Sequence, residues 1–231
     1  MVLTDRLIRA VDWFVPVELQ KSTATLWRAR IFVISHLVGP FSAVAILGYL
    51  YRVMPEHDGV FWTLCVMCGS FWALPFALKL ARDLYKPALF SFCVLTSVSV
   101  IGSFFYGGVS SPFLPWFLTA QMLGFFYLSD RPFMVLGIIG ANLAAFSVAY
   151  LTQGAFPERV PVGNLSTVGM ISICAATIYN SMMRSTTPMS WLRSRRCSRK
   201  ARTILKRLRS CESQSLMLKT PMKPRQSSWQ K

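Results

Sequence analysis

The sequence has few acidic residues and very little histidine. Only 9 of its 231 residues are Asp or Glu, only two are His, and charged residues make up 15% of the chain. Because a soluble domain carries about 25% charged residues, this scarcity argues against a soluble protein. A Walker phosphate loop, an H-E-x-x-H zinc motif and a G-x-S-x-G nucleophile motif are also absent from the sequence. We therefore expect no enzymatic activity, no catalytic residue, no metal site and no cofactor.

Hydrophobic residues take the place of the missing charge. They make up 53% of the chain, and the mean hydropathy is +0.44. They are grouped in blocks of about 20 residues, the length that an α-helix needs to cross a bilayer. The blocks predict an all-α, polytopic membrane protein with six transmembrane helices. The predicted spans cover residues 31–51, 60–78, 88–106, 114–128, 133–151 and 165–183.

The basic residues of the loops predict the orientation of these spans. The loops at 79–87 and 129–132 carry four Lys or Arg between them, and the segment before the first span carries five. The alternate loops at 52–59, 107–113 and 153–164 carry one or none each. Because basic loops stay on the cytoplasmic side, both termini are expected in the cytoplasm, as an even number of spans requires.

The lead-in at residues 1–30 has an amphipathic pattern. Apolar side chains recur there at spacings of three and four, with charged residues between them. We expect this segment to lie on the inner membrane surface or to be an ordinary solvated helix. The apolar residues of the pattern are Leu7, Ile8, Val11, Phe14 and Val15.

The tail at residues 184–231 differs in composition from the rest of the chain. It holds 14 Lys and Arg and a single acidic residue, Glu212. We expect it to be disordered or to lie on anionic lipid. Nucleic acid is not an expected partner, because the tail's only aromatic residues are Trp191 and Trp229 and no recognition fold is evident. The candidate lipid-binding residues are Arg193, Arg195, Arg196, Arg199 and Lys200.

Three residues are candidates for sensing or ligand binding. His36 lies within the first predicted span, where an ionisable side chain suggests a function, although neutral histidine also hydrogen-bonds neighbouring helices. His57 lies in an outer loop between Glu56 and Asp58, a cluster that suits a cation, a pH response or a plain solvated loop. Trp116 is expected where lipid meets water.

Other polar residues within the predicted spans permit a second interpretation. They suit either a solute pathway or hydrogen bonds between helices. A pathway would make the chain a small transport or channel subunit, with a flux that depends on Gln121, Asn142 or His36. Cys65 and Cys68 have C-x-x-C spacing, which within a span we interpret as two small apolar residues. The polar residues are Thr63, Gln121, Asn142 and Asn180.

The segment at residues 107–116 reads G-G-V-S-S-P-F-L-P-W and lies between two long apolar runs. Two glycines and two prolines cannot continue a helix, so a tight turn on the outer face is predicted. The motif Gly107-Gly108-x-x-Ser111-Pro112-x-x-x-Trp116 resembles one in the N-terminal membrane region of some bacterial sensor histidine kinases. The resemblance covers residues 25–183.

The resemblance implies a signal-input module in a bacterial inner membrane. Members of that family are usually dimeric and move helices against one another. The expected partners are therefore the lipid bilayer and either a second copy or an intact sensor kinase. Small residues in the fifth span suit close helix packing or a dimer face. They are Gly137, Gly140, Ala141, Ala144 and Ala145.

The sequence departs from the family after the sixth span. The H-E-[LI]-R-T-P phosphoacceptor motif and the ATP-binding motifs are absent, so we expect no kinase activity in this chain. Read one base out of register, codons for residues 217–230 can encode A-E-N-A-N-E-A-K-A-E-F-L-A, which is similar to the family's linker. The tail is therefore interpreted as a frameshift product beginning near residues 184–188. The alternative is a genuine tail that binds lipid or a partner.

Overall fold

The computed structural model describes residues 2–54, 56–157 and 159–186, and this part of the chain contains helices and loops but no strand. The described helices belong to one unit, Met1–Thr186. The proposed lipid-binding residues Arg193, Arg195, Arg196, Arg199 and Lys200 lie outside the described residues. Their role therefore stays a prediction.

The chain starts with a short helix that is followed by a long one. Helix α1 covers Val2–Phe14, the 3-10 turn η1 covers Val17–Lys21, and α2 covers Thr23–Val53. The backbone of Ser22 is extended, which separates the two helical directions. Helix α2 thus begins eight residues earlier than the predicted first span, and it continues through Pro40.

The remaining helices follow the predicted blocks closely. Helices α3 (Gly59–Ser70) and α4 (Leu74–Ala81), joined by the 3-10 turn η2 (Phe71–Ala73), form one rod that ends at Arg82. The following elements are α5 (Tyr85–Phe105), η3 (Gly108–Ser110), α6 (Leu114–Tyr127), α7 (Pro132–Gln153), η4 (Val162–Leu165) and α8 (Ser166–Thr186).

Four of the helical segments are long and apolar enough to cross a membrane: α2, the rod Gly59–Ala81, α5 and α7. Helix α6 has only 14 residues and is about 21 Å long, less than the roughly 30 Å of a hydrocarbon core. Helix α8 has 21 residues but contains Asn180 and several Ser and Thr, so it is less apolar. The structure therefore supports four of the six predicted spans by length and composition.

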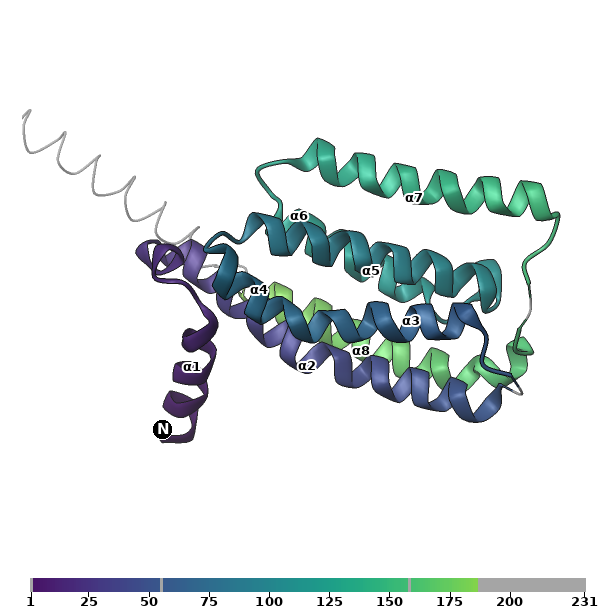
Figure 1. Cartoon of the computed structure of the whole chain (residues 1–231), viewed down its shortest axis with the longest axis horizontal. Coiled ribbons are helices and arrows are strands. Elements are labelled where there is room, and N and C mark those ends of the chain that lie inside the picture. Colours follow the sequence, from purple (N-terminus) through teal and green to yellow (C-terminus); the bar gives the residue numbers. More distant parts are fainter. Residues whose placement is uncertain (1, 55, 158, 187–231) are drawn as a thin grey trace, which may run out of the picture. The chain divides into compact units, whose positions relative to one another are not determined.

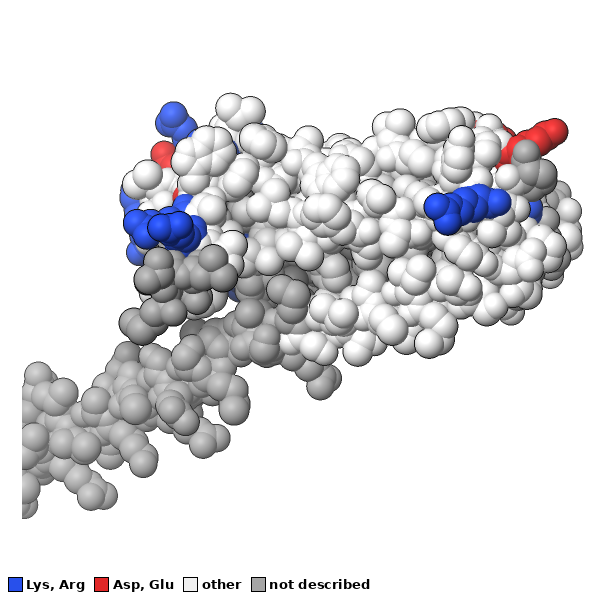
Figure 2. Space-filling view, turned by 90° about the horizontal axis from the view of Figure 1, so that it is seen from below, with Lys and Arg blue, Asp and Glu red and all other residues white. Residues whose placement is uncertain are grey.

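Charge is distributed along these helices as a membrane protein requires. Successive long helices run in alternate directions, so that the end of α4 and the starts of α5 and α7 lie together (Figure 1). Lys and Arg gather at one end, beside a broad band without charge (Figure 2). Basic residues at these helix termini are Lys79, Arg82, Lys86 and Arg131.

Helix α5 is the central element of the packing. It contacts α3, α4, α6 and α7, and half of its most apolar window is buried. Helix α7 packs on α5 and α6 through Val135 and Ile139, and only 11% of its window is buried. The small residues Gly137 and Gly140 are exposed and have open space beside them. Their role in a dimer face stays a prediction.

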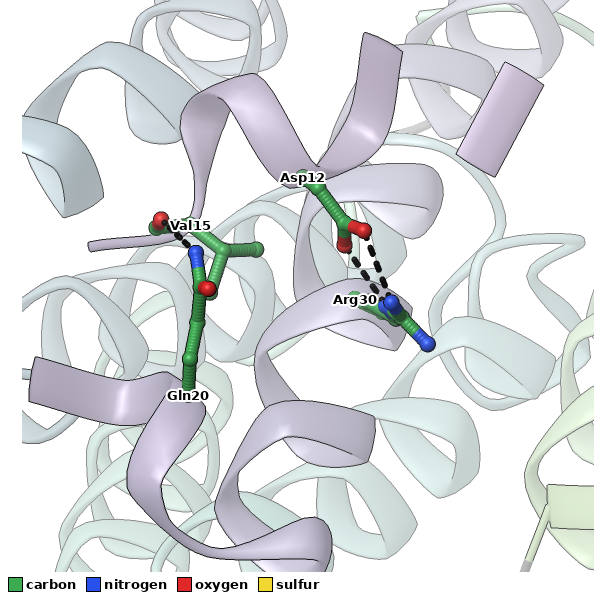
Figure 3. A network of polar contacts seen from close by, with 4 residues as sticks. All are labelled: Asp12, Val15, Gln20 and Arg30. Atoms are coloured by element: carbon green, nitrogen blue, oxygen red, sulfur yellow. Dashed lines mark hydrogen bonds and ion pairs between the residues drawn. The ribbon is translucent and has the colours of Figure 1, made fainter. Parts of the chain in front are cut away.

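Helix α1 is attached to the start of α2 by polar contacts (Figure 3). Nε and Nη2 of Arg30 each donate to one carboxylate oxygen of Asp12, both at 2.7 Å. The side-chain amide of Gln20 donates to the Val15 carbonyl at 3.0 Å. Val15 is buried in the core, whereas Leu7 remains 61% exposed. The amphipathic pattern therefore serves partly to dock the lead-in onto the other helices.

Candidate functional site

The turn at residues 107–116 is folded around two glycines with left-handed backbones. Gly107 has a φ of 98° and Gly108 a φ of 58°, conformations that other residues rarely adopt. The Ser111 hydroxyl, which is buried, accepts the backbone N–H of Phe113 at 3.2 Å. Pro115 lies in the first turn of α6, where its missing N–H is tolerated. The structure thus confirms a tight turn between two helices.

Close packing fixes this turn against its neighbours. A side chain on Gly102 would meet the ring of Phe113 at 2.7 Å, and one on Gly108 would overlap the ring of Phe156. Phe113 is buried and packs against Tyr106, with 5.7 Å between the ring centres. The turn therefore carries an aromatic side chain into the core and is not a mere surface connection.

A cavity of about 70 Å³ lies beside Phe113, among the described helices. Its walls come from α2, α3, η2, α5, α6 and α8, so it lies at the centre of the helical packing. No charged residue is among those described as lining it. The polar residues and Trp in its wall are Ser35, His36, Ser42, Ser91, Trp116 and Tyr179.

His36 is buried at one side of this cavity, with both ring nitrogens engaged. Nδ1 lies 2.6 Å from the carbonyl oxygen of Phe32, one turn earlier in α2. Nε2 lies 2.6 Å from the hydroxyl of Ser91 on α5. Because a carbonyl only accepts, Nδ1 carries the proton in the neutral ring and Nε2 accepts from Ser91. His36 therefore links α2 to α5 by a fully satisfied pair of hydrogen bonds.

Two tyrosines extend the network to α6 and α8. The Tyr127 hydroxyl lies 3.3 Å from the Ser35 hydroxyl, which itself donates to the Phe32 carbonyl at 2.9 Å. The Tyr179 hydroxyl donates to the Ser35 carbonyl at 2.5 Å. Four helices, α2, α5, α6 and α8, thus meet at one turn of α2. The carbonyl oxygens of this turn accept side-chain donors just before Pro40, whose missing N–H interrupts the hydrogen bonds of the helix backbone.

His57 lies apart from the cavity, beyond the end of α2. Its Nε2 donates to the Tyr51 carbonyl at 2.9 Å, and its ring stacks on Tyr51 with 4.0 Å between centres. Asp58 caps α3 by accepting the Phe61 N–H at 3.0 Å, and its carboxylate pairs with Arg159. The contacts of His57 and Asp58 are therefore structural, and no metal-binding group of three or more His, Cys, Asp or Glu occurs among the described residues.

The structure brings together two of the three candidate sensing residues. His36 and Trp116 both line the cavity, and Trp116 packs edge-on against Tyr179 with 5.9 Å between centres. Sequence reasoning missed Ser91 and Tyr179, because serine and tyrosine are common in spans and only the helix packing pairs them with α2. Asn142, a predicted pathway residue, donates to the Ile138 carbonyl of its own helix at 2.9 Å.

Cys65 and Cys68 lie beside this region as unpaired thiols. Cys68 is buried and lines the cavity, whereas Cys65 does not. Both line a second, wider groove of about 340 Å³ between α2 and α3. The groove and the cavity share Pro40, Ala43, Leu47 and Cys68 in their walls.

Comparison of the chain with protein-family models, curated proteins and solved structures finds no match.

Proposed function

We propose that the chain is the membrane-embedded signal-input region of a bacterial two-component system, similar to that of a sensor histidine kinase. The observation that carries this proposal is the position of the cavity between α2 and α8, with Tyr179 of α8 in its wall. Helix α8 is the last described helix before the C-terminal segment. A change in the cavity that moves Tyr179 would therefore move the helix that leads out of the unit.

In this proposal six helices cross the inner membrane and both termini face the cytoplasm. Helix α6 would cross together with the buried residues Pro112 and Phe113, which precede it in the core. Helix α8 would cross because its polar face is covered: Ser172 is fully buried and Tyr179 bonds to α2. Because the 231 residues contain no phosphoacceptor or ATP-binding motif, the proposed role is input alone, and any kinase output would be supplied outside them.

The topology is tested best at helix α6, the shortest proposed span. Val109 and Asp130 lie exposed in the loops before and after it. In a variant whose native cysteines are replaced, we expect an impermeant maleimide to label Val109→Cys only from outside and Asp130→Cys only from inside. Labelling of both from the same side would show that α6 does not cross.

The signalling role is tested by fusing residues 1–183 to the catalytic core of a sensor kinase. We expect Gly39→Ala, which displaces Tyr179, to change autophosphorylation of the fusion in membranes at least severalfold. Gly48→Ala is the matched control, because nothing lies within 4 Å of its added side chain. Equal activity of all three proteins would contradict an input role for the α2–α8 contact.

The proposed relationship to sensor kinases is tested by sequencing the gene beyond the last helix. We expect a neighbouring reading frame, followed from codon 180 onward, to continue into a phosphoacceptor H-E-[LI]-R-T-P motif and an ATP-binding core. If every frame lacks these motifs, the kinship loses its main support, and the basic tail must be examined as a lipid-binding segment.

A further inference from the structure

The hydroxyl groups in the cavity wall have no proton left for a ligand. Ser91 donates its proton to Nε2 of His36, because Nδ1 is committed to the Phe32 carbonyl. Tyr179 donates to the Ser35 carbonyl at 2.5 Å, and Ser42 donates to the Gly39 carbonyl at 2.7 Å. Each hydroxyl keeps unused lone pairs, since one oxygen accepts two hydrogen bonds. This side of the cavity therefore offers a ligand hydrogen-bond acceptors and no hydroxyl donor.

One N–H donor is present elsewhere in the described wall. The indole N–H of Trp116 has no acceptor among the described residues, while its ring packs on Tyr179. A hydroxyl group can both donate to a serine or tyrosine oxygen and accept from an indole. A carbonyl can only accept, so it would meet the lone pairs of the wall's hydroxyl groups without a hydrogen between them.

The rest of the wall limits the charge and size of a ligand. The other described lining residues are apolar apart from Cys68, so an ion would enter without a counter-charge at a cost of several kcal/mol. A volume of about 70 Å³ is several times the roughly 10–15 Å³ that one water needs, but about half of the 150 Å³ cavity known to hold benzene. The cavity therefore suits a molecule of a few heavy atoms.

We propose that this cavity binds a small uncharged alcohol, with its hydroxyl between Ser91 and Tyr179 and its short carbon chain toward Leu95 and Val98. The inference extends to the hydroxyl end of a longer amphiphile, whose chain would leave by the groove between α2 and α3. It concerns binding alone, so it goes beyond the proposed signalling role and stands independently of it.

The test uses two probes of matched size, 1-butanol and butanone, on the full chain in nanodiscs. Saturation-transfer NMR reports which probe contacts the protein, and nanodiscs without protein give the lipid background. We expect 1-butanol to bind roughly fivefold to tenfold more tightly than butanone, the worth of one hydrogen bond to an otherwise unfilled acceptor.

Two alanines of α2 provide a matched pair of variants. Ala43 lines the cavity, whereas Ala45 is exposed and lines neither hollow. Ala43→Phe should abolish the protein-specific 1-butanol signal, and Ala45→Phe should keep it. Ala43→Leu is a smaller filling that replaces Ala43→Phe if the latter does not fold.

Three results would overturn the proposal: no protein-specific signal from 1-butanol, an equal signal from the Ala43 and Ala45 variants, or equally tight binding of butanone. None of these results changes the outcome of the maleimide labelling or of the kinase fusion. Failure of the binding proposal is therefore distinguishable from failure of the proposed function.

Discussion

The hydroxyl of Tyr179 on α8 lies directly over Gly39 on α2 and donates to the Ser35 carbonyl at 2.5 Å. A side chain at position 39 would overlap this hydroxyl. Small residues at helix crossings in membranes allow such close approach, because association there depends on packing and interhelical hydrogen bonds. The hydrogen bond from Tyr179 to Ser35 thus links α8 to α2.

We predict that Gly39→Ala lowers the free energy of unfolding in detergent by about 1–3 kcal/mol, because the methyl group forces Tyr179 away. Tyr179→Phe removes the hydroxyl, so the double variant should lose less than the sum of the single variants. Gly48→Ala, in the same helix with open space beside it, should be neutral or slightly stabilising. Strict additivity would mean that the two residues do not touch.

Mutation of Ser91 and mutation of His36 should lower the free energy of unfolding by different amounts. We predict that Ser91→Ala costs about 1–3 kcal/mol, because Nε2 of His36 stays buried without a donor. His36→Leu should cost less, since the freed Ser91 hydroxyl can bond to a carbonyl of its own helix. Adding Ser91→Ala to His36→Leu should then have little further effect in the same unfolding assay.

The control for this pair is a serine without a partner. Ser103 is buried on α5 and its hydroxyl has no partner among the described residues. Ser103→Ala should therefore be neutral or stabilising. If Ser91→Ala were equally harmless, the assignment of protons in the His36 network would be wrong.

The two hydrogen bonds between Arg30 and Asp12 hold α1 against the start of α2. Both side chains are partly exposed, 22% and 30%, so the pair is worth about 1 kcal/mol and salt should weaken it. We predict that Asp12→Asn and Arg30→Lys each speed hydrogen exchange of the amides of α1, because either change removes the two-pronged charged contact. Exchange in α7, which lies apart from α1 in Figure 1, should stay the same.

Asp58 serves both as the cap of α3 and as the partner of Arg159. Asparagine is also a good cap, so Asp58→Asn should lose only the ion pair, and Asp58→Ala should lose about 1 kcal/mol more. Arg159→Met should add little to Asp58→Asn but should still destabilise the wild type. Equal unfolding free energies for the Asn and Ala variants would argue against the cap.

Much of the fold could be predicted from the chain because its signals are local. Apolar blocks of about 20 residues specify long helices, and the glycines and prolines at 107–115 specify a turn. The start of α2 was harder to place, because Arg28 and Arg30 suggest a segment outside the membrane. In the structure Arg30 instead pairs with Asp12 and continues the helix.

The candidate site was predictable only in part. His36 could be predicted because an ionisable side chain is unusual within a span, and Trp116 because an indole is typical of the boundary between lipid and water. Their partners could not, because Ser91 and Tyr179 are ordinary residues of other helices. Ser91 lies 55 positions from His36, and Tyr179 lies 144 positions from Ser35, to which it bonds. Nothing local to either residue indicates which way its helix is rotated.

The sequence by itself determined the helices, the tight turn at residues 107–116 and the charge at the helix ends, since these follow from hydrophobicity and backbone freedom along a few consecutive residues. The tertiary structure decided that His36 is a satisfied hydrogen-bonding residue, that His57 stands apart, and that a cavity opens beside Phe113. These facts depend on how the helices are rotated and spaced. In a chain with few charges that arrangement is set by close packing of small and aromatic side chains, which no local pattern encodes.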